Sequence, residues 1–180
     1  MAAKRMLIAG FGGQGVLLIG QLIAYTAMFD GKEVTWMPTY GPEMRGGTAN
    51  CSVILSDNKV GSPIVDKPDI LVALNKPSLE KYEDSVVAGG QIFVDSSLID
   101  IKVKRTDVEV YYIPASKIAS DESLSGLANM IMVGHMIKHG NIVEYDTVEK
   151  AMKKTVPAKK QNLFDMNLKA VDIGYNYSED

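Results

Sequence analysis

The stretch that decides the fold reads Met6-Leu7-Ile8-Ala9-Gly10-Phe11-Gly12-Gly13-Gln14-Gly15-Val16, an apolar run followed by a glycine-rich turn. The apolar run has the composition of a parallel strand that is covered on both faces. Residues 16–29, which come next, are 14 residues of mostly apolar helix formers, and Asp30-Gly31 follow them. We therefore expect a strand, a tight turn and a helix in succession, the unit from which sheets flanked by helices are built.

The same alternation continues along the chain. Apolar or alternating runs predict further strands, at 33–37, 49–55, 70–74, 90–94 and 108–113. Helix formers predict further helices, at 78–87 with Ser78 as the cap, 127–139, 146–155 and 159–175. Residues 56–61 have the composition of a turn into a short partner strand, and either that strand or the one at 110–112 would add an antiparallel element. The fold class we expect is α/β, a single three-layer domain over 1–180 with a mostly parallel or mixed sheet.

Composition sets limits on function. The 180 residues are 46% hydrophobic and 23% charged with a formal charge of −3, which is typical of one folded domain. Lys and Arg are scattered along the chain, so no basic stripe points to nucleic acid. The longest apolar run, 16–29, is 14 residues and therefore too short to span a bilayer. The first residues lead directly into a strand rather than into a signal peptide, and we expect a cytoplasmic protein.

The sequence contains no recognisable catalytic or metal-binding set. Its single cysteine, Cys51, excludes a disulfide framework, and an iron–sulfur cluster or cysteine-rich zinc site held by this chain alone would need several thiolates. The serines at 96–97 lack the flanking glycines of a nucleophile elbow. His135 and His139 are four residues apart, but no third ligand accompanies them. Asp95 ends a predicted strand, where α/β folds place their sites, and it is either a site residue or, as we favour, a cap of the following turn.

The glycine-rich turn has three interpretations. Gly10, Gly12 and Gly15 have the Gly-x-Gly-x-x-Gly spacing of a dinucleotide-binding turn, which offers helix N–H groups to a pyrophosphate. That motif needs a carboxylate at the end of the second strand, where this chain has Trp36-Met37-Pro38-Thr39. The spacing also fits a P-loop, but Val16-Leu17 stand where Lys and Ser or Thr are needed. A free-standing dinucleotide-binding domain therefore stays open as an alternative, as does a turn that only brings a helix close to the sheet.

Two predicted helices are apolar on nearly every side, namely 16–29 and 127–137. A helix without a polar face must be buried all round. Either a partner subunit covers part of these helices, or the C-terminal segments of the same chain do so.

The loop Tyr40-Gly41-Pro42-Glu43-Met44-Arg45-Gly46-Gly47 follows a predicted strand and combines an aromatic residue, two opposite charges and three glycines. An ion pair between Glu43 and Arg45 that fixes a surface loop is one interpretation. Together with Gly10-Phe11-Gly12-Gly13-Gln14-Gly15, however, the loop closely resembles the gamma subunit of 2-oxoacid:ferredoxin (acceptor) oxidoreductases. The resemblance extends to Ser62-Pro63, to 68–73 and to 162–175, and so covers nearly the whole chain.

The resemblance implies a Rossmann-like domain that packs against the other subunits of an enzyme. That enzyme oxidatively decarboxylates a 2-oxoacid with coenzyme A and yields an acyl-CoA, CO2 and reduced ferredoxin or another reduced acceptor. The resemblance also implies thiamine diphosphate and Mg2+ on the alpha and beta subunits, iron–sulfur clusters on the beta subunit or a ferredoxin-like delta subunit, and no cofactor on the gamma chain. The short chain is most similar to the 2-oxoglutarate type, and the pyruvate, branched-chain and indolepyruvate types share its motifs.

The candidate residues for contact with a cofactor or a partner subunit belong to the two motifs: Gly10, Gly12, Gly13, Gln14, Gly15, Tyr40, Gly41, Pro42, Glu43, Arg45, Gly46 and Gly47. Both motifs follow the carboxyl end of a predicted strand, which is where α/β folds place their functional crevice. No catalytic residue is assigned to this chain.

Overall fold

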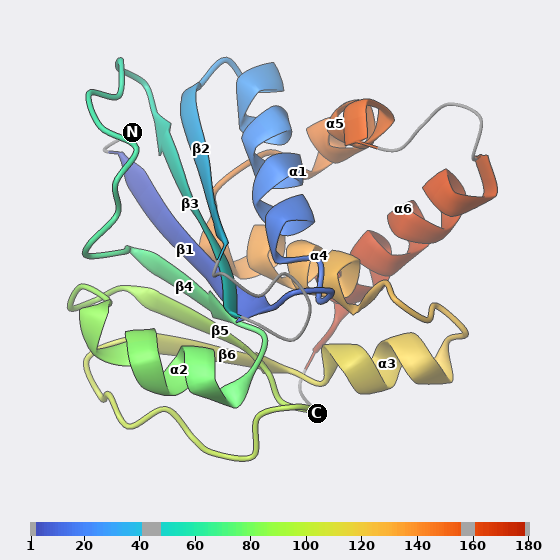
Figure 1. Ribbon diagram of the computed structural model, residues 1–180. Helices are drawn as coiled ribbons and strands as arrows, with labels where there is room; N and C mark the ends of the chain where they lie inside the picture. The colour runs from blue at the N-terminus through green and yellow to red at the C-terminus, as the bar shows by residue number, and fades with distance from the viewer. Residues whose placement is uncertain (1–2, 41–47, 156–160, 179–180) are drawn as a thin grey trace.

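A computed structural model describes residues 3–40, 48–155 and 161–178, and in these residues it contains one six-stranded sheet (Figure 1). The strands are β1 (Lys4–Phe11), β2 (Glu33–Tyr40), β3 (Thr48–Ser56), β4 (Ile70–Ala73), β5 (Gln91–Asp95) and β6 (Glu109–Ile113), in the order β2-β3-β1-β4-β5-β6. β1, β4, β5 and β6 run parallel, whereas β3 is antiparallel to both β1 and β2. The prediction of a mostly parallel, mixed sheet is confirmed.

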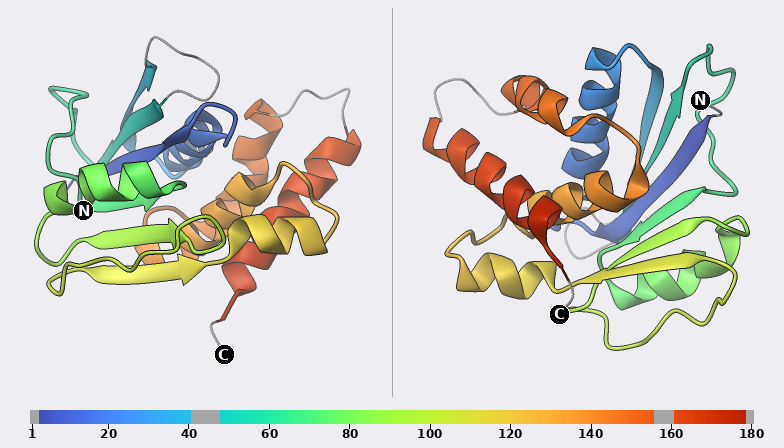
Figure 2. Two further views of the ribbon diagram at one scale, coloured as in Figure 1. Left: turned by 60° about the horizontal axis from the view of Figure 1, so that its bottom comes forward. Right: turned by 180° about the vertical axis from the view of Figure 1, so that it is seen from behind.

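Helices cover both faces of this sheet (Figure 2). They are α1 (Val16–Phe29), α2 (Lys76–Tyr82), α3 (Ala115–Asp121), α4 (Ala128–Gly140), α5 (Val148–Thr155) and α6 (Gln161–Asn176), with 3-10 turns at Glu83–Ser85 and Tyr145–Thr147. α1, α4, α5 and α6 share one hydrophobic core with the sheet, and the segment around α2 forms a second core on the opposite face. The three-layer arrangement that the sequence predicts is therefore present.

Three local predictions were wrong. Residues 57–69 form no strand after β3, and β6 is parallel to β5, so β3 alone supplies the antiparallel pairing among the described strands. The lengths of the connections account for the directions of the strands. A short link joins the antiparallel strands β2 and β3, whereas the longer 96–108 segment allows β6 to return parallel to β5. The cap of α2 is Asn75 rather than Ser78, since the Asn75 side chain accepts a hydrogen bond from the Ser78 N–H at 2.8 Å.

The chain itself covers one of the two apolar helices fully and the other in part. α4 is buried along nearly its whole length, and α6 packs directly against it, while α5 packs on α1. Backbones of α4 and α6 touch at two glycines: a Cβ at Gly134 would lie 2.0 Å from the Val171 carbonyl oxygen, and one at Gly174 would lie 1.8 Å from that of Ile131. Coverage by the C-terminal segments therefore accounts for α4, whereas α1 leaves Met28 57% and Phe29 47% exposed, so coverage by a partner stays a prediction for that helix.

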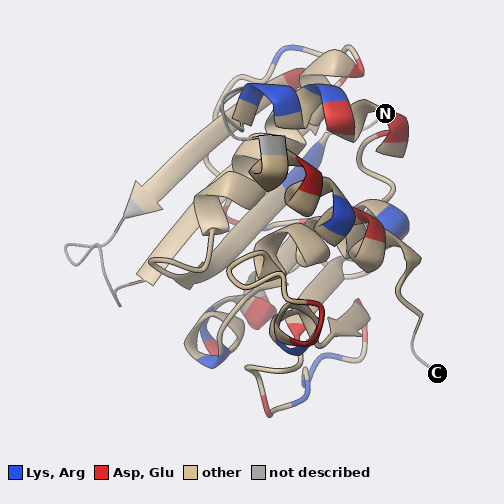
Figure 3. Cartoon of the chain, turned by 90° about the vertical axis from the view of Figure 1, so that its right-hand side faces the viewer, with Lys and Arg blue, Asp and Glu red and all other residues tan. Residues whose placement is uncertain are grey.

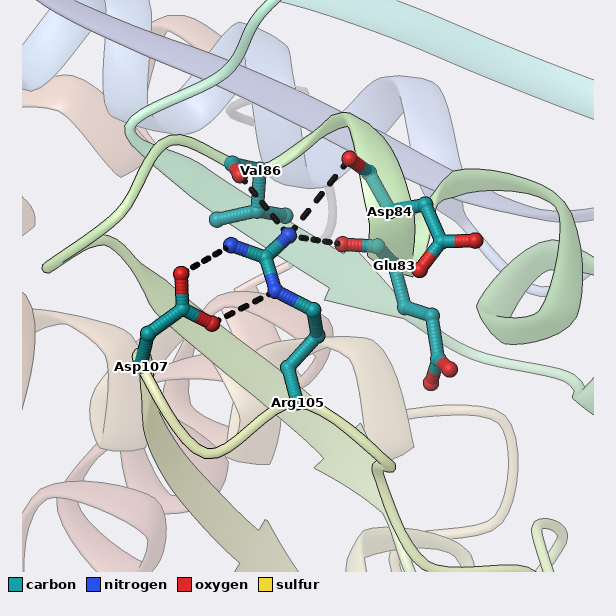
Figure 4. A network of polar contacts seen from close by, with 5 residues as sticks. All are labelled: Glu83, Asp84, Val86, Arg105 and Asp107. Atoms are coloured by element: carbon teal, nitrogen blue, oxygen red, sulfur yellow. Dashed lines mark hydrogen bonds and ion pairs between the residues drawn. The ribbon is translucent and has the colours of Figure 1, made fainter.

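A hydrogen-bond network around Arg105 joins the segments that lie at the amino ends of β5 and β6 (Figure 4). The Arg105 guanidinium donates two hydrogen bonds to the Asp107 carboxylate, at 2.6 and 2.7 Å, and lowers the pKa of that carboxyl. It also donates to the carbonyl oxygens of Glu83, Asp84 and Val86, at 3.0 to 3.4 Å. This network joins the segment before β6 to the turn after α2 and lies at the end of the sheet away from the glycine turn.

We predict that Gly174→Ala destabilises the chain by about 1–3 kcal/mol, because the added Cβ would meet backbone atoms that cannot move aside. Helix propensity by itself favours Ala over Gly by about 1 kcal/mol, so a loss of stability reports the packing. Urea unfolding of the purified chain measures the effect. Gly61→Ala is the control, since a Cβ there meets nothing within 4 Å. A Gly174→Ala chain as stable as its parent would contradict the close contact of α4 with α6.

Candidate functional site

The glycine turn is fixed by one side chain. The Gln14 carboxamide oxygen accepts a hydrogen bond from the Phe11 N–H at 2.6 Å, and its nitrogen donates to the Leu74 carbonyl oxygen at 2.8 Å. The Asn75 amide donates to the same Gln14 oxygen at 3.4 Å. Gln14 therefore ties the turn after β1 to the end of the neighbouring parallel strand β4.

The glycines of the turn serve close packing. A Cβ at Gly10 would lie 2.8 Å from the Gln14 side-chain oxygen, and one at Gly15 would lie 2.3 Å from the Asn129 amide nitrogen. Gly15 also has φ +75° and Gly13 has φ +102°, a region that residues with a side chain rarely adopt. Gly12 lies between Gly10 and Gly13 in the turn. These contacts support the interpretation that the turn brings α1 and α4 close to the sheet.

An open cavity of about 200 Å³ lies beside this turn. The elements that form it meet at the carboxyl edge of the sheet, and its lining residues are Gly13, Gln14, Leu74, Asp95, Leu98, Ser116, Gly126, Ala128 and Asn129. The structure thus brings two of the predicted site residues, Gly13 and Gln14, together with groups from β5, α3 and α4. This is the crevice position expected for an α/β fold.

Asp95 is buried at the end of β5, and its carboxylate is fully engaged. It accepts hydrogen bonds from the Ser97 N–H at 3.1 Å, the Ser116 N–H at 3.2 Å and the Ser116 hydroxyl at 2.6 Å. The predicted capping role is confirmed, and the same carboxylate also caps the start of α3. Because its oxygens are occupied by these donors, Asp95 is a structural group of the crevice rather than a free base.

Asn129 is the crevice residue that the sequence analysis missed. It lies in the first turn of α4, is 6% exposed, and its side-chain oxygen has no hydrogen-bond partner among the described residues. The available signal is a polar amide inside an otherwise apolar run, a pattern that by itself predicts only a helix. Its relation to the glycine turn becomes visible only when α4 is placed against Gly15.

The ends of the predicted loop lie next to the glycine turn, although residues 41–47 themselves lie outside the described residues. Tyr40, the last residue of β2, pairs with Ala49 of β3, which in turn pairs with Gly10. Thr48 pairs with Phe11. The two motifs therefore start and end at the same edge of the sheet. The positions of Gly41, Pro42, Glu43, Arg45, Gly46 and Gly47 stay predictions.

The segments around the glycine turn are uncharged, although the same edge of the sheet carries the buried Asp95 and the exposed pair of Lys76 and Asp100. Residues 6–29 and 123–137, which supply the glycine turn and the starts of α1 and α4, contain no Lys, Arg, Asp or Glu. Phe11 and Leu98 are 36% and 48% exposed there. In Figure 3 the end of the sheet at the left of the view carries almost no blue or red, whereas the charged residues mark the helices elsewhere. An uncharged surface with exposed apolar side chains, as around the glycine turn, is typical of a contact surface.

The remaining candidate groups are buried in the core. Cys51 is fully buried and burial raises the pKa of its thiol to about 12, so the prediction of a small buried residue is confirmed. Burial, with a smaller effect of His139, lowers the pKa of His135 to about 4.

Over the described ranges, no group of three or more His, Cys, Asp or Glu is placed to hold a metal ion. No helix in that part of the chain is long and apolar enough to cross a membrane.

Comparison with known families and proteins gives a consistent result. Residues 5–177 match the family model of pyruvate ferredoxin/flavodoxin oxidoreductase. Ketoisovalerate oxidoreductase subunit VorA of Methanothermobacter thermautotrophicus is 41% identical over 98% of this chain, but the chain spans only 36% of that protein's length. The 2-oxoglutarate synthase subunit KorC of Methanocaldococcus jannaschii is 38% identical, over 98% of this chain and 95% of KorC.

Two solved structures share the fold at comparable coverage of this chain. The gamma subunit of a keto/oxoacid ferredoxin oxidoreductase from Geobacter sulfurreducens is 29% identical, with a TM-score of 0.80 over 96% of both chains. The 2-oxoglutarate:ferredoxin oxidoreductase of Magnetococcus marinus, solved with 2-oxoglutarate, coenzyme A and succinyl-CoA bound, is 26% identical with a TM-score of 0.87. That likeness covers 97% of this chain and 30% of the Magnetococcus chain.

We predict that Gln14→Ala destabilises the chain by about 1–3 kcal/mol, because the Phe11 N–H and the Leu74 carbonyl oxygen lose their partner. Chemical denaturation measures the change. Gln21→Ala on α1 is the matched control, since the Gln21 side chain makes no hydrogen bond within the described structure, and we expect a change below about 0.5 kcal/mol. Equal effects of the two substitutions would show that Gln14 does not hold the turn.

Proposed function

The chain belongs to the pyruvate ferredoxin/flavodoxin oxidoreductase family, and from this premise we propose that it is the gamma subunit of a 2-oxoacid:ferredoxin (acceptor) oxidoreductase. The complete enzyme takes a 2-oxoacid and coenzyme A to an acyl-CoA and CO2. The two electrons released pass to ferredoxin or another acceptor. The partners in this proposal are the alpha and beta subunits and, in enzymes that have one, a delta subunit.

The observation that carries the proposal is the meeting of two motifs at the carboxyl edge of the sheet. The glycine turn lies there, and so do Tyr40 and Thr48, the described residues on either side of 41–47, with Thr48 paired to Phe11. These two motifs are also the basis of the resemblance to the gamma subunits. The uncharged segments around the glycine turn, with Phe11 and Leu98 partly exposed, suit contact with the other subunits.

The residues of this chain support a role in assembly rather than in the chemistry. An iron–sulfur cluster needs several thiolates, whereas the sequence has one cysteine and Cys51 is buried. The Asp95 carboxylate is occupied by its own serine and N–H donors. We therefore place thiamine diphosphate, Mg2+ and the iron–sulfur clusters of the enzyme on partner chains, with coenzyme A as its co-substrate.

We propose 2-oxoglutarate as the first substrate to test. KorC, a 2-oxoglutarate synthase subunit by name, matches this chain over 95% of its own length. VorA, a ketoisovalerate oxidoreductase subunit, is slightly more identical but is a longer protein. The branched-chain, pyruvate and indolepyruvate acids complete the panel, because their enzymes share the same motifs.

Co-expression with the chains encoded beside it tests the proposal. A tag on this chain should recover larger subunits, and the recovered complex should form acyl-CoA from one of the 2-oxoacids. The chain alone should be colourless and inactive, because it lacks the thiolates for a cluster. Stoichiometric iron–sulfur or flavin absorbance in the lone chain would contradict the proposal. Micromolar binding of NAD to the lone chain would favour a free-standing dinucleotide-binding domain instead.

We also predict that Arg45→Ala and Glu43→Ala leave the lone chain folded but reduce recovery of the complex or its turnover. A guanidinium can engage a carboxylate or a carbonyl cluster of a partner with two hydrogen bonds. Loss of such a buried contact at an interface costs about 2–5 kcal/mol.

Arg5→Ala is the matched control for these two substitutions. Arg5 forms an exposed pair with Asp69 at 3.8 Å, at the amino end of β1. An exposed pair of this kind is worth about 0–1 kcal/mol. Unchanged complex recovery and unchanged acyl-CoA formation in both loop variants would mean that the loop is an ordinary surface turn.

A further inference from the structure

His135 is a titratable group enclosed in the core. It lies on α4, is 3% exposed, and neither of its ring nitrogens makes a hydrogen bond with normal geometry to a described residue. Buried polar atoms in folded proteins are nearly always hydrogen-bonded, because an unsatisfied one lowers the stability of the fold. This histidine is therefore held in surroundings that do not suit its polar ring.

The surroundings are aromatic on several sides. The ring centroids of Phe93, from β5, and Tyr111, from β6, lie 6.0 and 6.2 Å from that of His135, and both rings stand nearly perpendicular to it. His139, one turn further along α4, lies at 4.7 Å, and Tyr177, just after α6, lies at 5.7 Å. The imidazole is thus packed between the sheet and the end of the C-terminal segment as an aromatic core residue would be.

The acidic groups on the elements around His135 have other partners. On β6, Glu109 accepts a hydrogen bond from the Tyr111 hydroxyl at 2.9 Å. On α6, Asp172 accepts one from the Tyr145 hydroxyl. Neither carboxylate is paired with His135, so a proton on the imidazole would bring an unpaired charge into the core.

The pKa of His135 reflects these surroundings. Burial lowers it most and the neighbouring His139 lowers it further, from 6.5 to about 4, whereas the Gly174 backbone acts the other way with a smaller effect. Lys138, the other base on this part of α4, lies over the Tyr175 ring, 4.9 Å from its centroid. An unfolded chain takes up the proton at a higher pH than the folded chain does, so the folded chain loses stability as the pH falls from about 6.5 toward 4.

The C-terminal segment is the part that can move to let water reach His135. α6 packs on α4 at Gly134, the residue before His135, and at Gly174, where the two backbones touch. β5, on the other side of the imidazole, is paired with β4 and β6 along its length. Because α6 is held by side-chain packing rather than by a ladder of backbone hydrogen bonds, it is the element that separates at the lower cost.

We propose that His135 makes the contact between α4 and α6 sensitive to acid: when the imidazole takes up a proton, α6 and Tyr177 move away from α4 and water enters. The contact is closed at neutral pH, and its open form becomes more populated as the pH falls toward 5. The inference concerns the chain by itself and does not depend on the proposed function.

The test is amide hydrogen exchange of the lone chain at pH 7 and pH 5, with each rate referred to the intrinsic exchange rate at that pH. The opening equilibrium constant of the α6 amides should rise about twentyfold between the two values, since only the open form binds the proton in this range. α2 is the internal control, because it packs in the second core on the opposite face, and its local opening leaves His135 buried. The α6 amides should also open more often than those of β4 at both pH values.

His135→Phe keeps a ring in the same place and removes the titration, so the opening of α6 should no longer depend on pH in this range. His139→Phe is the matched control: it keeps a ring beside Tyr111, and the rise should remain. If His135→Phe does not fold, Tyr177→Ala replaces it, and there the rise should begin at a higher pH because the imidazole is less enclosed.

Three results would overturn the inference. The first is an α6 opening constant in the parent chain that is the same at pH 7 and pH 5. The second is a rise that persists in His135→Phe or, where that variant does not fold, one that begins at the parental pH in Tyr177→Ala. The third is equal opening of α6 and β4, which would mean that the whole chain unfolds rather than this contact.

Discussion

The hydrogen bonds of Gln14 fix the glycine turn at the carboxyl edge of the sheet, and the candidate site is built around this turn. Through them the turn after β1 is fixed to the end of β4, and this places Gly15 against Asn129 at the start of α4. Glycine is required at 10 and 15 because side chains there would collide with these same groups. One amide thus aligns the sheet, α1 and α4 at the carboxyl edge, and the cavity exists because they meet in this way.

Charge is distributed so that the two ends of the sheet differ. The pairs Arg5–Asp69, Lys32–Asp57 and Arg105–Asp107 lie at the amino ends of the parallel strands, where they join neighbouring segments. The carboxyl edge also has an ion pair, Lys76–Asp100, but the segments around its glycine turn are uncharged and leave Phe11 partly exposed. Desolvating those segments costs less free energy than desolvating charged groups, so the surface around the glycine turn is suited to burial by another chain.

The sequence predicts correctly the bounds of an element whose ends are marked by residues next to it. The helix at 16–29 was predicted with the bounds that the structure has, because Gly15 and Asp30-Gly31 mark its two ends. The family resemblance was likewise confirmed, since the family model matches residues 5–177. Predictions that depend on distant partners were less successful. The antiparallel direction of β3 follows from its pairing with β1, and the burial of α4 follows from α6, which lies some thirty residues further along the chain.

The candidate site shows the same division. Its glycines and Gln14 were recognised from their spacing, whereas the roles of Asn129 and of Ser116 depend on contacts between segments far apart in sequence. Ser116 belongs to α3, a helix of seven residues that was not predicted because so short a segment shows little periodicity. Asp95 was placed correctly at a strand end, but its second role, capping α3, required the position of that helix.

Amide hydrogen exchange of the chain, alone and within its recovered complex, tests most directly the claim that the surface around the glycine turn is the contact surface. We predict that assembly slows exchange in residues 10–18 and 123–129, which form the glycine turn and the start of α4. Exchange in α5 and in the outer face of α6 should change little, because their charged residues remain in solvent. Slowed exchange confined to α5 and α6, with no change at the glycine turn, would contradict the account.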